Sequence, residues 1–363
     1  MRLGVKAALV GRELVPGDVE IADGRIARVG LPSANGKGVA SPGFVDLQVN
    51  GFGGVDFLDA DAAGYRVAGQ AMLETGVTAY LPTFITSPEE QLVAALTEMP
   101  NGSEGSPHVL GAHLEGPFLA PERLGTHPES ARRDPDTDLL ERLLAAGPVR
   151  LVTLAPELPG AGALIDLLHR RGVTVSCGHT DANALEANAA FDLGVHTVTH
   201  LFNAMRPFNH RDPGIAGVAL SRDDVIVQVI LDGIHLAPDT AKLIWSVGGG
   251  RVALVTDSMA GAGNGDGSYS LGGLEVEIRD GVARGPDGVL AGSSLTMIEA
   301  VRNLHSLGVP LADALDAATA VPSRIIGLAS EGLVAGAPAD VVVLDDNLEV
   351  ARVLVGGELN GVV

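Results

Sequence analysis

The sequence predicts an α/β fold in which a central (β/α)8 barrel carries a small β-sandwich domain built from both chain ends. Three observations predict it. Eight short apolar runs follow one another through the middle of the chain, segments with helix signals separate many of them, and β-rich segments stand at the two ends. A doubly wound open sheet would produce the same alternation, and periodicity alone does not exclude it.

The two chain ends carry strand and hairpin signals. Near the N-terminus, Asp23-Gly24 separates two runs that contain apolar residues, 19–22 and 26–29, and Asp-Gly in that setting favours a hairpin. Near the C-terminus, the runs 340–344 and 353–355 also read as strands. Two β-rich ends can pair, so we expect one small β domain from residues 1–41 and 332–363 around a TIM-like barrel at 42–331.

The eight apolar runs are the predicted barrel strands. Helix-like segments separate many of them, and several of these segments close with a glycine, where a helix C-cap needs positive φ. The runs are 44–49, 78–81, 109–114, 149–154, 173–177, 196–199, 225–231 and 252–256, and the helix-like segments are 62–76, 136–147, 161–172, 182–194 and 238–247. After the eighth run we expect an inserted hairpin at 272–291 and helices at 293–307 and 311–320.

The composition narrows the classes of partner. The 363 residues carry a formal net charge of −21, which argues against nucleic acid and anionic membrane surfaces as partners. No stretch of about 18 apolar residues appears, so no membrane span is predicted. The only cysteine, Cys177, permits no intrachain disulfide, and the apolar run after Lys6 breaks too early for a signal-peptide core. We therefore expect a cytoplasmic protein.

Polar side chains collect where the apolar runs end. The carboxyl ends of barrel strands meet at one rim, where barrel active sites lie, so these residues are candidates for a single site. Taken alone, Glu115 would be an ordinary loop residue or helix cap, and His179 or His200 a hydrogen-bonded core histidine. Their coincidence with Asp257, one acid or imidazole per strand end, instead favours a metal hydrolase.

Six segments of the chain form a recognisable set. They are Pro42-Gly43-Phe44-Val45-Asp46, His113-Leu114-Glu115-Gly116-Pro117, Gly178-His179-Thr180, His200-Leu201-Phe202-Asn203-Ala204-Met205, Asp257 and Gly336-Ala337-Pro338-Ala339-Asp340. Together they resemble the N-acetylglucosamine-6-phosphate deacetylase family of the amidohydrolase superfamily, in order and over nearly the whole chain. The second and fourth segments are highly specific to that family, whereas the terminal ones are shared with many amidohydrolases.

The resemblance implies that Glu115, His179 and His200 hold a divalent metal and that Asp257 is the catalytic acid/base. Three oxygen and nitrogen ligands leave a fourth position for water, as in catalytic zinc sites, and such an ion lowers the pKa of water to about 7. We expect Zn²⁺, while the ligand types also admit Fe²⁺, Co²⁺ and Mn²⁺.

The end of the first barrel strand departs from the wider superfamily. Many amidohydrolases carry His-x-His there for a second metal, whereas this chain has Gln48-Val49-Asn50. A neutral amide is a poor ligand for transition metals, so we predict one metal ion per chain. Gln48 and Asn50 are instead expected to hydrogen-bond the substrate or the metal's water, and capping of the strand end is the alternative.

The implied reaction is hydrolysis of N-acetylglucosamine 6-phosphate to acetate and glucosamine 6-phosphate. Asp257 takes a proton from the attacking water and delivers it to the departing amine, and His127 of the family pattern Gly125-Thr126-His127 assists the oxyanion. The resemblance also implies a homodimer in which Arg211 and its neighbours reach the phosphate from the partner subunit. The expected substrate contacts are Gln48, Thr126, His127, Asn203, Ala204, Arg211, Asp232, His235, Leu290, Ala291 and Gly292.

Three alternatives stay open at this point. A D-aminoacylase-like amide hydrolase or a ring deaminase shares the barrel and the metal, but is not expected to carry the segment 200–205 with Arg211 downstream. A metal-free barrel acting as a binding module would not need both a metal triad and Asp257.

The glycine-rich segment 260–268 matches no nucleotide-binding pattern and is expected to be a mobile solvent loop, with a substrate-covering loop as the alternative.

Overall fold

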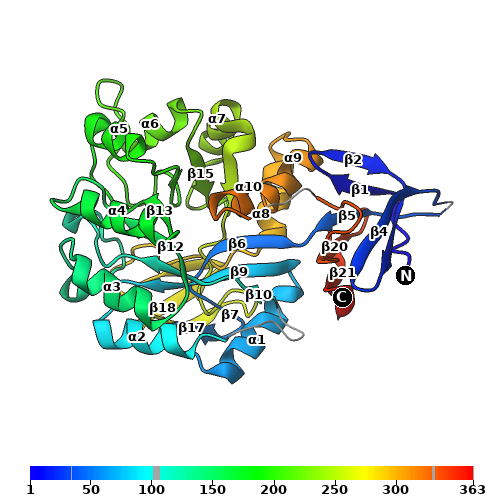
Figure 1. Ribbon diagram of the computed structural model, residues 1–363, viewed down its shortest axis with the longest axis horizontal. Coiled ribbons are helices and arrows are strands. Elements are labelled where there is room, and N and C mark those ends of the chain that lie inside the picture. The colour runs from blue at the N-terminus through cyan, green and yellow to red at the C-terminus, as the bar shows by residue number, and fades with distance from the viewer. Residues whose placement is uncertain (34, 101–106, 329–331, 363) are drawn as a thin grey trace.

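The computed structural model describes residues 1–33, 35–100, 107–328 and 332–362. Figure 1 shows a large body of strands and helices and, beside it, a smaller β-rich body that holds both chain ends. No helix among the described residues is long and apolar enough to cross a membrane.

Eight parallel strands form the barrel, and their order around it follows the chain. All nine residues of β9 (Val77–Ile85) are buried, which explains why the strands appear in the sequence as continuous apolar runs. The other seven are β6 (Phe44–Val49), β11 (Ala112–Glu115), β12 (Val149–Leu154), β13 (Thr174–Cys177), β14 (Thr197–Val198), β15 (Ile226–Val229) and β16 (Val252–Leu254). The predicted barrel is confirmed.

The seam between β16 and β6 closes the barrel and excludes the doubly wound open sheet. A parallel bridge joins Val49 to Ser258, and Asn50 N–H donates to the Ser258 carbonyl over 2.8 Å. Lower in the seam, Asp46 accepts hydrogen bonds from the Thr256 hydroxyl at 2.6 Å and from the Thr256 N–H at 3.2 Å. A buried carboxylate here replaces ladder hydrogen bonds.

The third predicted strand is interrupted. Residues 109–114 divide into β10 (His108–Val109), which pairs beside β9, and β11. Gly111 lies between them with φ +124°, and a Cβ there would come within 2.9 Å of the Pro148 carbonyl oxygen. The kink is therefore a position that favours glycine.

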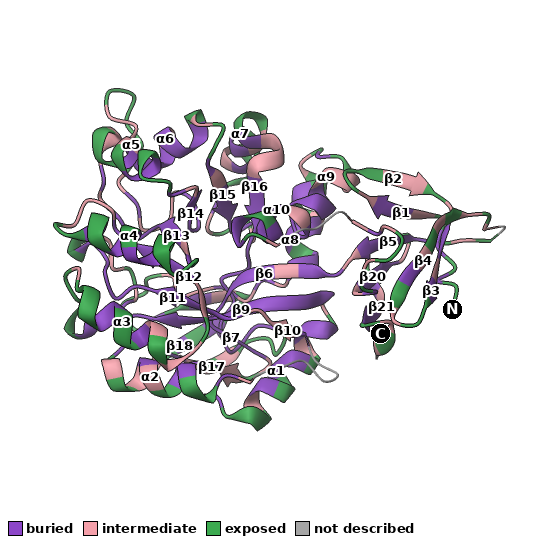
Figure 2. Ribbon diagram, viewed as in Figure 1, coloured by how far each residue is buried: buried purple, intermediate pink, exposed green. Residues whose placement is uncertain are grey.

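Helices surround the barrel, with exposed outer faces and buried inner faces (Figure 2). All five predicted helix-like segments contain a helix, at α1 (Ala62–Leu73), α3 (Thr137–Ala146), α4 (Ala161–Arg170), α5 (Ala184–Asp192) and α7 (Pro238–Gly248). Further helices are α2 (Glu89–Glu98), α6 (Gly214–Ser221), α8 (Met297–Ser306), α9 (Leu311–Asp316) and α10 (Ala320–Ile325), with 3-10 turns η1 (Pro121–Arg123), η2 (Glu129–Ala131) and η3 (Gly249–Arg251).

The single helix predicted at 311–320 is wrong, because the chain forms α9 and then α10 with a break between them. The carbonyls of Ala317 and Ala318 accept hydrogen bonds from the N–H groups of Leu254 and Val45 at 2.8 and 2.9 Å. These carbonyls are committed to the barrel strands on either side of the seam, so they are not available to a continuous helix.

The predicted hairpin at 272–291 is a three-stranded antiparallel sheet that starts earlier. Its strands are β17 (Gly267–Leu271), β18 (Leu274–Arg279) and β19 (Val282–Arg284). The sheet packs apolar side chains against Ile85 and Met259 of the barrel. The preceding residues 260–262 are buried, so the segment 260–268 is not a solvent loop throughout.

The small domain combines both chain ends, as the sequence predicts. Its six-stranded sheet runs in the order β2 (Glu13–Pro16), β1 (Ala7–Val10), β5 (Val39–Pro42), β20 (Val341–Leu344), β21 (Val350–Val355) and β22 (Glu358–Val362). The predicted hairpin of β3 (Asp18–Ala22) and β4 (Arg25–Leu31) packs on this sheet around a second apolar core. The domain limits 1–41, 42–331 and 332–363 remain predictions, and the limit at 331 lies outside the described residues. A short hairpin of β7 (Gly51–Phe52) and β8 (Val55–Asp56) follows β6.

Candidate active site

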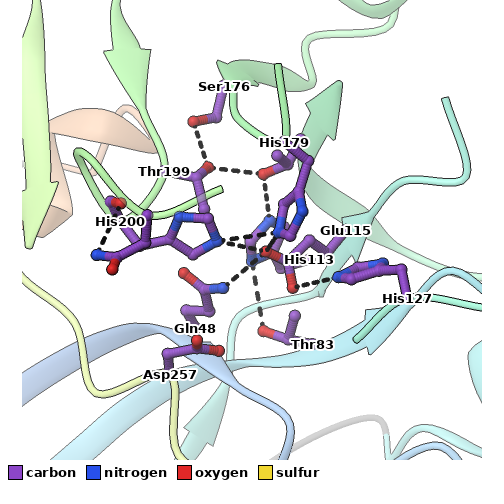
Figure 3. Close-up of polar contacts among 12 residues, drawn as sticks. Gln48, Thr83, His113, Glu115, His127, Ser176, His179, Thr199, His200 and Asp257 are labelled. Atoms are coloured by element: carbon purple, nitrogen blue, oxygen red, sulfur yellow. Dashed lines mark hydrogen bonds and ion pairs between the residues drawn. The ribbon is translucent and has the colours of Figure 1, made fainter. Parts of the chain in front are cut away.

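Three strand ends bring Glu115, His179 and His200 together. Glu115 is the last residue of β11, and each histidine lies two residues beyond the end of its strand, β13 or β14. Glu115 Oε1 lies 3.1 Å from His179 Nε2 and 3.0 Å from His200 Nε2, and the two nitrogens are 3.1 Å apart (Figure 3). All three side chains are buried. The residues predicted as metal ligands from separate motifs thus form one cluster.

This cluster suits a divalent metal ion. His179 Nδ1 lies 2.8 Å from the Arg123 carbonyl oxygen, which can only accept, so Nδ1 carries the proton and Nε2 presents its lone pair to the cluster. A carboxylate and imidazole lone pairs facing one another at this distance repel unless a cation lies among them. Ligands about 2.1 Å from a tetrahedral ion lie roughly 3.4 Å apart, close to the spacing here. The site is therefore a divalent-metal site of the Glu/His/His type.

The environment of Glu115 favours the ionised form of its carboxyl over the protonated form. Burial by itself raises the pKa of this carboxyl, but hydrogen bonds with His127, His179 and His200 outweigh burial and hold it well below its ordinary value. Gln48 Nε2 also donates to Glu115 Oε1 over 3.0 Å. Glu115 is therefore available as an anionic ligand at neutral pH.

Asp257 lies in the same group of side chains (Figure 3) in a contrasting environment. Burial first, and the negative charge of Glu115 second, raise the pKa of Asp257 to about 6. Its side chain accepts one hydrogen bond from the described residues, from Asn50 Nδ2 at 2.7 Å. A carboxylate with a pKa near neutrality can both accept and release a proton.

Several of these residues adopt an uncommon backbone conformation. His179 and Asp257 have φ +49°, and His200 has φ +30°, values that side-chain-bearing residues rarely adopt. Such strain persists where the surrounding structure holds it, and it concentrates at functional sites. Each of the three follows a strand end, so the turn aims the side chain into the rim.

His127 is a neutral hydrogen-bond donor beside the cluster. The Thr86 N–H donates to His127 Nδ1 over 3.3 Å, which leaves the proton on Nε2, 3.6 Å from Glu115 Oε2. Burial, and then the neighbouring His179, lower the pKa of His127 to about 4. The imidazole therefore stays uncharged at neutral pH and presents an N–H toward the cluster.

A buried polar layer supports the strands that carry these ligands. His113 Nδ1 lies 3.1 Å from the Leu47 carbonyl, so Nδ1 donates and Nε2 accepts from the Thr153 hydroxyl at 2.7 Å. The chain of contacts continues from Thr153 to Thr199 at 2.7 Å. It ends with the contact from Thr199 to Ser176 at 2.6 Å (Figure 3). These four residues, from four consecutive barrel strands or their ends, were not singled out as a network in the sequence.

The cluster opens into a cavity of about 320 Å³ at the barrel rim. Seven of the predicted substrate contacts line it together with the metal cluster and Asp257: Thr126, His127, Asn203, Ala204, His235, Leu290 and Gly292. The remaining lining residues are Asn50, Ile85, Glu122, Arg123, Gly125, Leu271 and Val289.

Four predicted substrate contacts do not line this cavity. Gln48 is fully buried behind Glu115, and Asp232 lies behind His235, with its Oδ2 2.6 Å from His235 Nδ1. Ala291 is buried, and Arg211 is exposed and outside the cavity of the single chain. A residue near a strand end can face the cavity or stand behind a residue that does, and only side-chain packing decides between the two.

Arg123 was not identified from the sequence, although it precedes the pattern Gly125-Thr126-His127 by only two residues. It lines the cavity, and its carbonyl holds His179. The signal that could have found it is a basic residue within the loop that follows a ligand-bearing strand. Thr86, which sets the proton position on His127, follows β9 and carries no comparable signal in the sequence.

The amidohydrolase family model matches residues 39–360 of this chain. The N-acetylglucosamine-6-phosphate deacetylase of Homo sapiens is 41% identical over 345 residues, which cover 89% of this chain and 84% of that protein. The N-acetylgalactosamine-6-phosphate deacetylase of Escherichia coli O157:H7 is 35% identical over 353 residues, which cover 94% of each chain.

Two solved structures match over nearly the full length. The N-acetylglucosamine-6-phosphate deacetylase of Thermotoga maritima superposes with a TM-score of 0.91 at 32% identity and covers 100% of both chains. A mutant N-acetyl-D-glucosamine-6-phosphate deacetylase of Mycobacterium smegmatis, in complex with N-acetyl-D-glucosamine-6-phosphate, superposes with a TM-score of 0.93 at 38% identity and covers 98% of both chains.

Proposed function

Because this chain belongs to the amidohydrolase family, we propose that it hydrolyses the acetamido group of N-acetylglucosamine 6-phosphate to acetate and glucosamine 6-phosphate. The observation that carries the proposal is the buried cluster of Glu115, His179 and His200, with Asp257 beside it in one cavity. The full-length similarity to deacetylases of this substrate supports the choice of reaction over a deaminase or a D-aminoacylase-like hydrolase.

Glu115, His179 and His200 hold one divalent ion in this proposal, with Zn²⁺ as the first choice. When bound, the ion supplies Lewis-acid activation of a water molecule and of the acetyl carbonyl. Gln48 supports a count of one ion, because its amide N–H donates to Glu115 and so turns a hydrogen, not a lone pair, toward the cluster. Two tightly bound ions per chain in a metal analysis would contradict this.

Asp257 serves as the general base and then as the general acid. Its carboxylate accepts a proton from the attacking water and delivers that proton to the departing amine nitrogen. Asn50 keeps the carboxylate oriented by donating to one oxygen, Oδ1, and the other oxygen accepts no hydrogen bond from the described residues. That oxygen is the one available for the proton transfer.

His127 donates a hydrogen bond from Nε2 to the oxyanion that develops on the acetyl carbonyl. Since its pKa is lowered to about 4, the donor is a neutral imidazole whose tautomer is held by the Thr86 N–H. A donor fixed before reaction stabilises the transition state without reorganisation.

The sugar phosphate lies along the rest of the cavity in this proposal. Contacts come from Thr126, Asn203, Ala204, His235, Leu290 and Gly292. The Ala204 N–H donates to no described residue and is free to bind a substrate oxygen. Gln48, Asp232 and Ala291 act through the neighbours they contact, and Arg211 is assigned to the partner subunit's cavity in a homodimer.

We place the enzyme in the cytoplasm, since its one cysteine is buried and unpaired.

Acetate release from N-acetylglucosamine 6-phosphate tests this function. We expect turnover by the protein as purified, loss of turnover after chelation, and recovery when Zn²⁺ is added back. Turnover that persists after the metal has been removed to below a tenth of an equivalent would contradict the metal-dependent reaction.

N-acetylgalactosamine 6-phosphate is the second candidate substrate, because a relative covering 94% of the chain is named for it. Its kcat/KM should be measured beside that of the glucosamine compound. We expect the glucosamine compound to be preferred, and the reverse order would reassign the sugar while leaving the chemistry unchanged.

A further inference from the structure

The cavity has one arginine or lysine among its described lining residues, and that residue is Arg123. The other charged lining groups include the carboxylates of Glu115, Glu122 and Asp257, and the whole chain carries a formal charge of −21. A phosphate dianion is repelled by such a field unless a cation stands close to it. Arg211, the arginine that the resemblance implies for this task, lies outside the cavity of its own chain.

We propose that Arg123 binds the phosphate of the substrate from within the same chain, and that Asp181 holds its guanidinium in position. The proposal rests on the proposed function and names the residue that binds the phosphate of that substrate. It assigns Arg123 a task separate from any contribution by a partner subunit.

The backbone of Arg123 is tied to the metal cluster. Arg123 ends the turn η1 (Pro121–Arg123), and its carbonyl oxygen accepts the His179 Nδ1 hydrogen bond at 2.8 Å. The same residue therefore supports a predicted metal ligand and carries the cation. Because the Arg123 backbone is hydrogen-bonded to His179, the distance from the cluster to the guanidinium cannot exceed about the length of one arginine side chain.

The side chain of Arg123 is fixed at its other end by Asp181. Nε and Nη2 donate to Asp181 Oδ1 over 2.8 and 2.5 Å. Asp181 is only two residues beyond His179, and its own N–H donates to Glu157 Oε1 over 2.6 Å. The guanidinium is thus held by one carboxylate oxygen of the loop that carries the metal ligand, and Glu157 in turn holds the backbone of that loop.

Asp181 is shared with a second arginine, which keeps its carboxylate oriented. Arg206 donates from Nη1 to Asp181 Oδ2 over 2.8 Å and from Nε to Asp212 over 3.0 Å. Neither Arg206 nor Asp181 lines the cavity, so within this network only Arg123 does. Its Nη1 donates to no described residue, and its side chain is 29% exposed.

This arrangement suits recognition of a phosphate monoester at a set distance from an amide. Arginine donates parallel hydrogen bonds to phosphate oxygens, and a guanidinium already held in place loses little freedom on binding. The phosphate is remote from the scissile bond, so its contact is the same in the ground state and the transition state. Removing it should raise KM and leave kcat nearly unchanged.

Arg123→Gln tests the proposal in the metal-loaded enzyme. We expect KM for N-acetylglucosamine 6-phosphate to rise about 10- to 100-fold, the range for losing a hydrogen-bonded charge, with kcat within about twofold. Turnover of unphosphorylated N-acetylglucosamine should not change. Calorimetric titration with inorganic phosphate and with glucosamine 6-phosphate should show the same loss of affinity.

Arg133→Gln is the matched control, because Arg133 is an exposed arginine outside the cavity and the charge change is identical. It should leave KM and phosphate affinity at wild-type values. Metal content is measured in every variant. If Arg123→Gln lost metal, Asp181→Asn would replace it, since it frees the guanidinium while keeping Arg123 in place; we expect a rise in KM of about 3- to 10-fold.

The outcomes separate this inference from the proposed function. A wild-type KM and a wild-type phosphate affinity in Arg123→Gln would overturn the assignment of Arg123 to the phosphate and leave the deacetylase reaction intact. Where Arg123→Gln loses metal, the same result in Asp181→Asn would do so. If the wild-type protein released no acetate from any N-acetylhexosamine 6-phosphate, the proposed function would fall. The titrations with inorganic phosphate would then decide by themselves whether Arg123 binds phosphate.

Discussion

Two buried aspartates, one in each domain, show how this molecule separates chemistry from stability. Asp18, in the small β domain, is 3% exposed, and Asp257, at the barrel rim, is 9% exposed. Asp18 accepts hydrogen bonds from the N–H groups of Val5 and Val19 and from Arg2 Nε at 2.8 to 3.1 Å. Asp257 accepts a single one, from Asn50.

The consequence is an opposite shift in pKa. Burial raises the pKa of both carboxyls, but the donors around Asp18 outweigh burial and lower it, whereas burial and the charge of Glu115 raise that of Asp257 to about 6. A fully satisfied buried acid stabilises its fold, and an under-satisfied acid next to another carboxylate is prepared for proton transfer. Burial alone therefore does not identify a catalytic acid.

The largest expected effect is that of Asp257→Asn. We expect kcat to fall about 10²- to 10⁴-fold, since the proton shuttle is lost, while metal content and folding stability are retained. Steady-state kinetics, metal analysis and thermal unfolding check this together. Substantial activity at full metal content would remove Asp257 from the mechanism and, with it, the contrast to Asp18.

Asp18→Ala should have the reverse profile. The change leaves the buried N–H groups of Val5 and Val19 without an acceptor, at a cost of about 1–3 kcal/mol in the free energy of unfolding. Urea unfolding measures the cost, and kcat/KM per folded molecule should stay at the wild-type value. A fall in kcat/KM with unchanged stability would mean that the small domain takes part in catalysis.

The pH dependence should distinguish the two acids in the wild-type protein. Asp257 must be ionised to accept a proton, so kcat/KM should fall about tenfold per pH unit below the pKa of about 6, and a bound dication can only move this limb to lower pH. The pKa of Asp18 is lowered in the folded protein, so its stabilisation is present in full above the ordinary carboxyl value of 3.8 and is lost as the pH falls from there through the lower pKa of the folded state. Activity and stability should therefore decline in separate pH ranges.

The smallest effect is expected at the surface of the small domain. Arg28 and Glu20 form an ion pair at 2.7 Å across the β3–β4 hairpin, with 65% and 30% of their side chains exposed. A double-mutant cycle with Arg28→Ala and Glu20→Ala should give a coupling energy below about 1 kcal/mol. A coupling energy above the measured cost of Asp18→Ala would show that this exposed pair contributes more to the domain than the buried Asp18.

The parts of the structure with local signals were predicted well. The run 44–49 is β6 and the run 149–154 is β12, residue for residue, and the Asp23-Gly24 turn joins β3 to β4. The break between α9 and α10 was not predictable, because it depends on hydrogen bonds from Leu254 and Val45, far away in the chain. The helix propensity of residues 311–320 carries no information about hydrogen bonds to residues so distant in the sequence.

The candidate site divides in the same way. Glu115, His179 and His200 could be found because each belongs to a motif at a strand end, and parallel strands bring their carboxyl ends to one rim. The positions of Gln48 behind Glu115 and of Arg123 beside the cavity could not, because each depends on side chains from other strands.

The sequence by itself determined the order of strands and helices, the family of the chain and the residues that collect at the barrel rim. These follow from local patterning and from motifs whose linear order a barrel preserves. Only the tertiary structure decided that Asp18 is satisfied and Asp257 is not, that Thr86 sets the proton on His127, and that Arg123 is held by Asp181. The physical reason is that pKa, tautomer and side-chain orientation depend on donors and charges within a few ångströms, and folding draws these from distant parts of the chain.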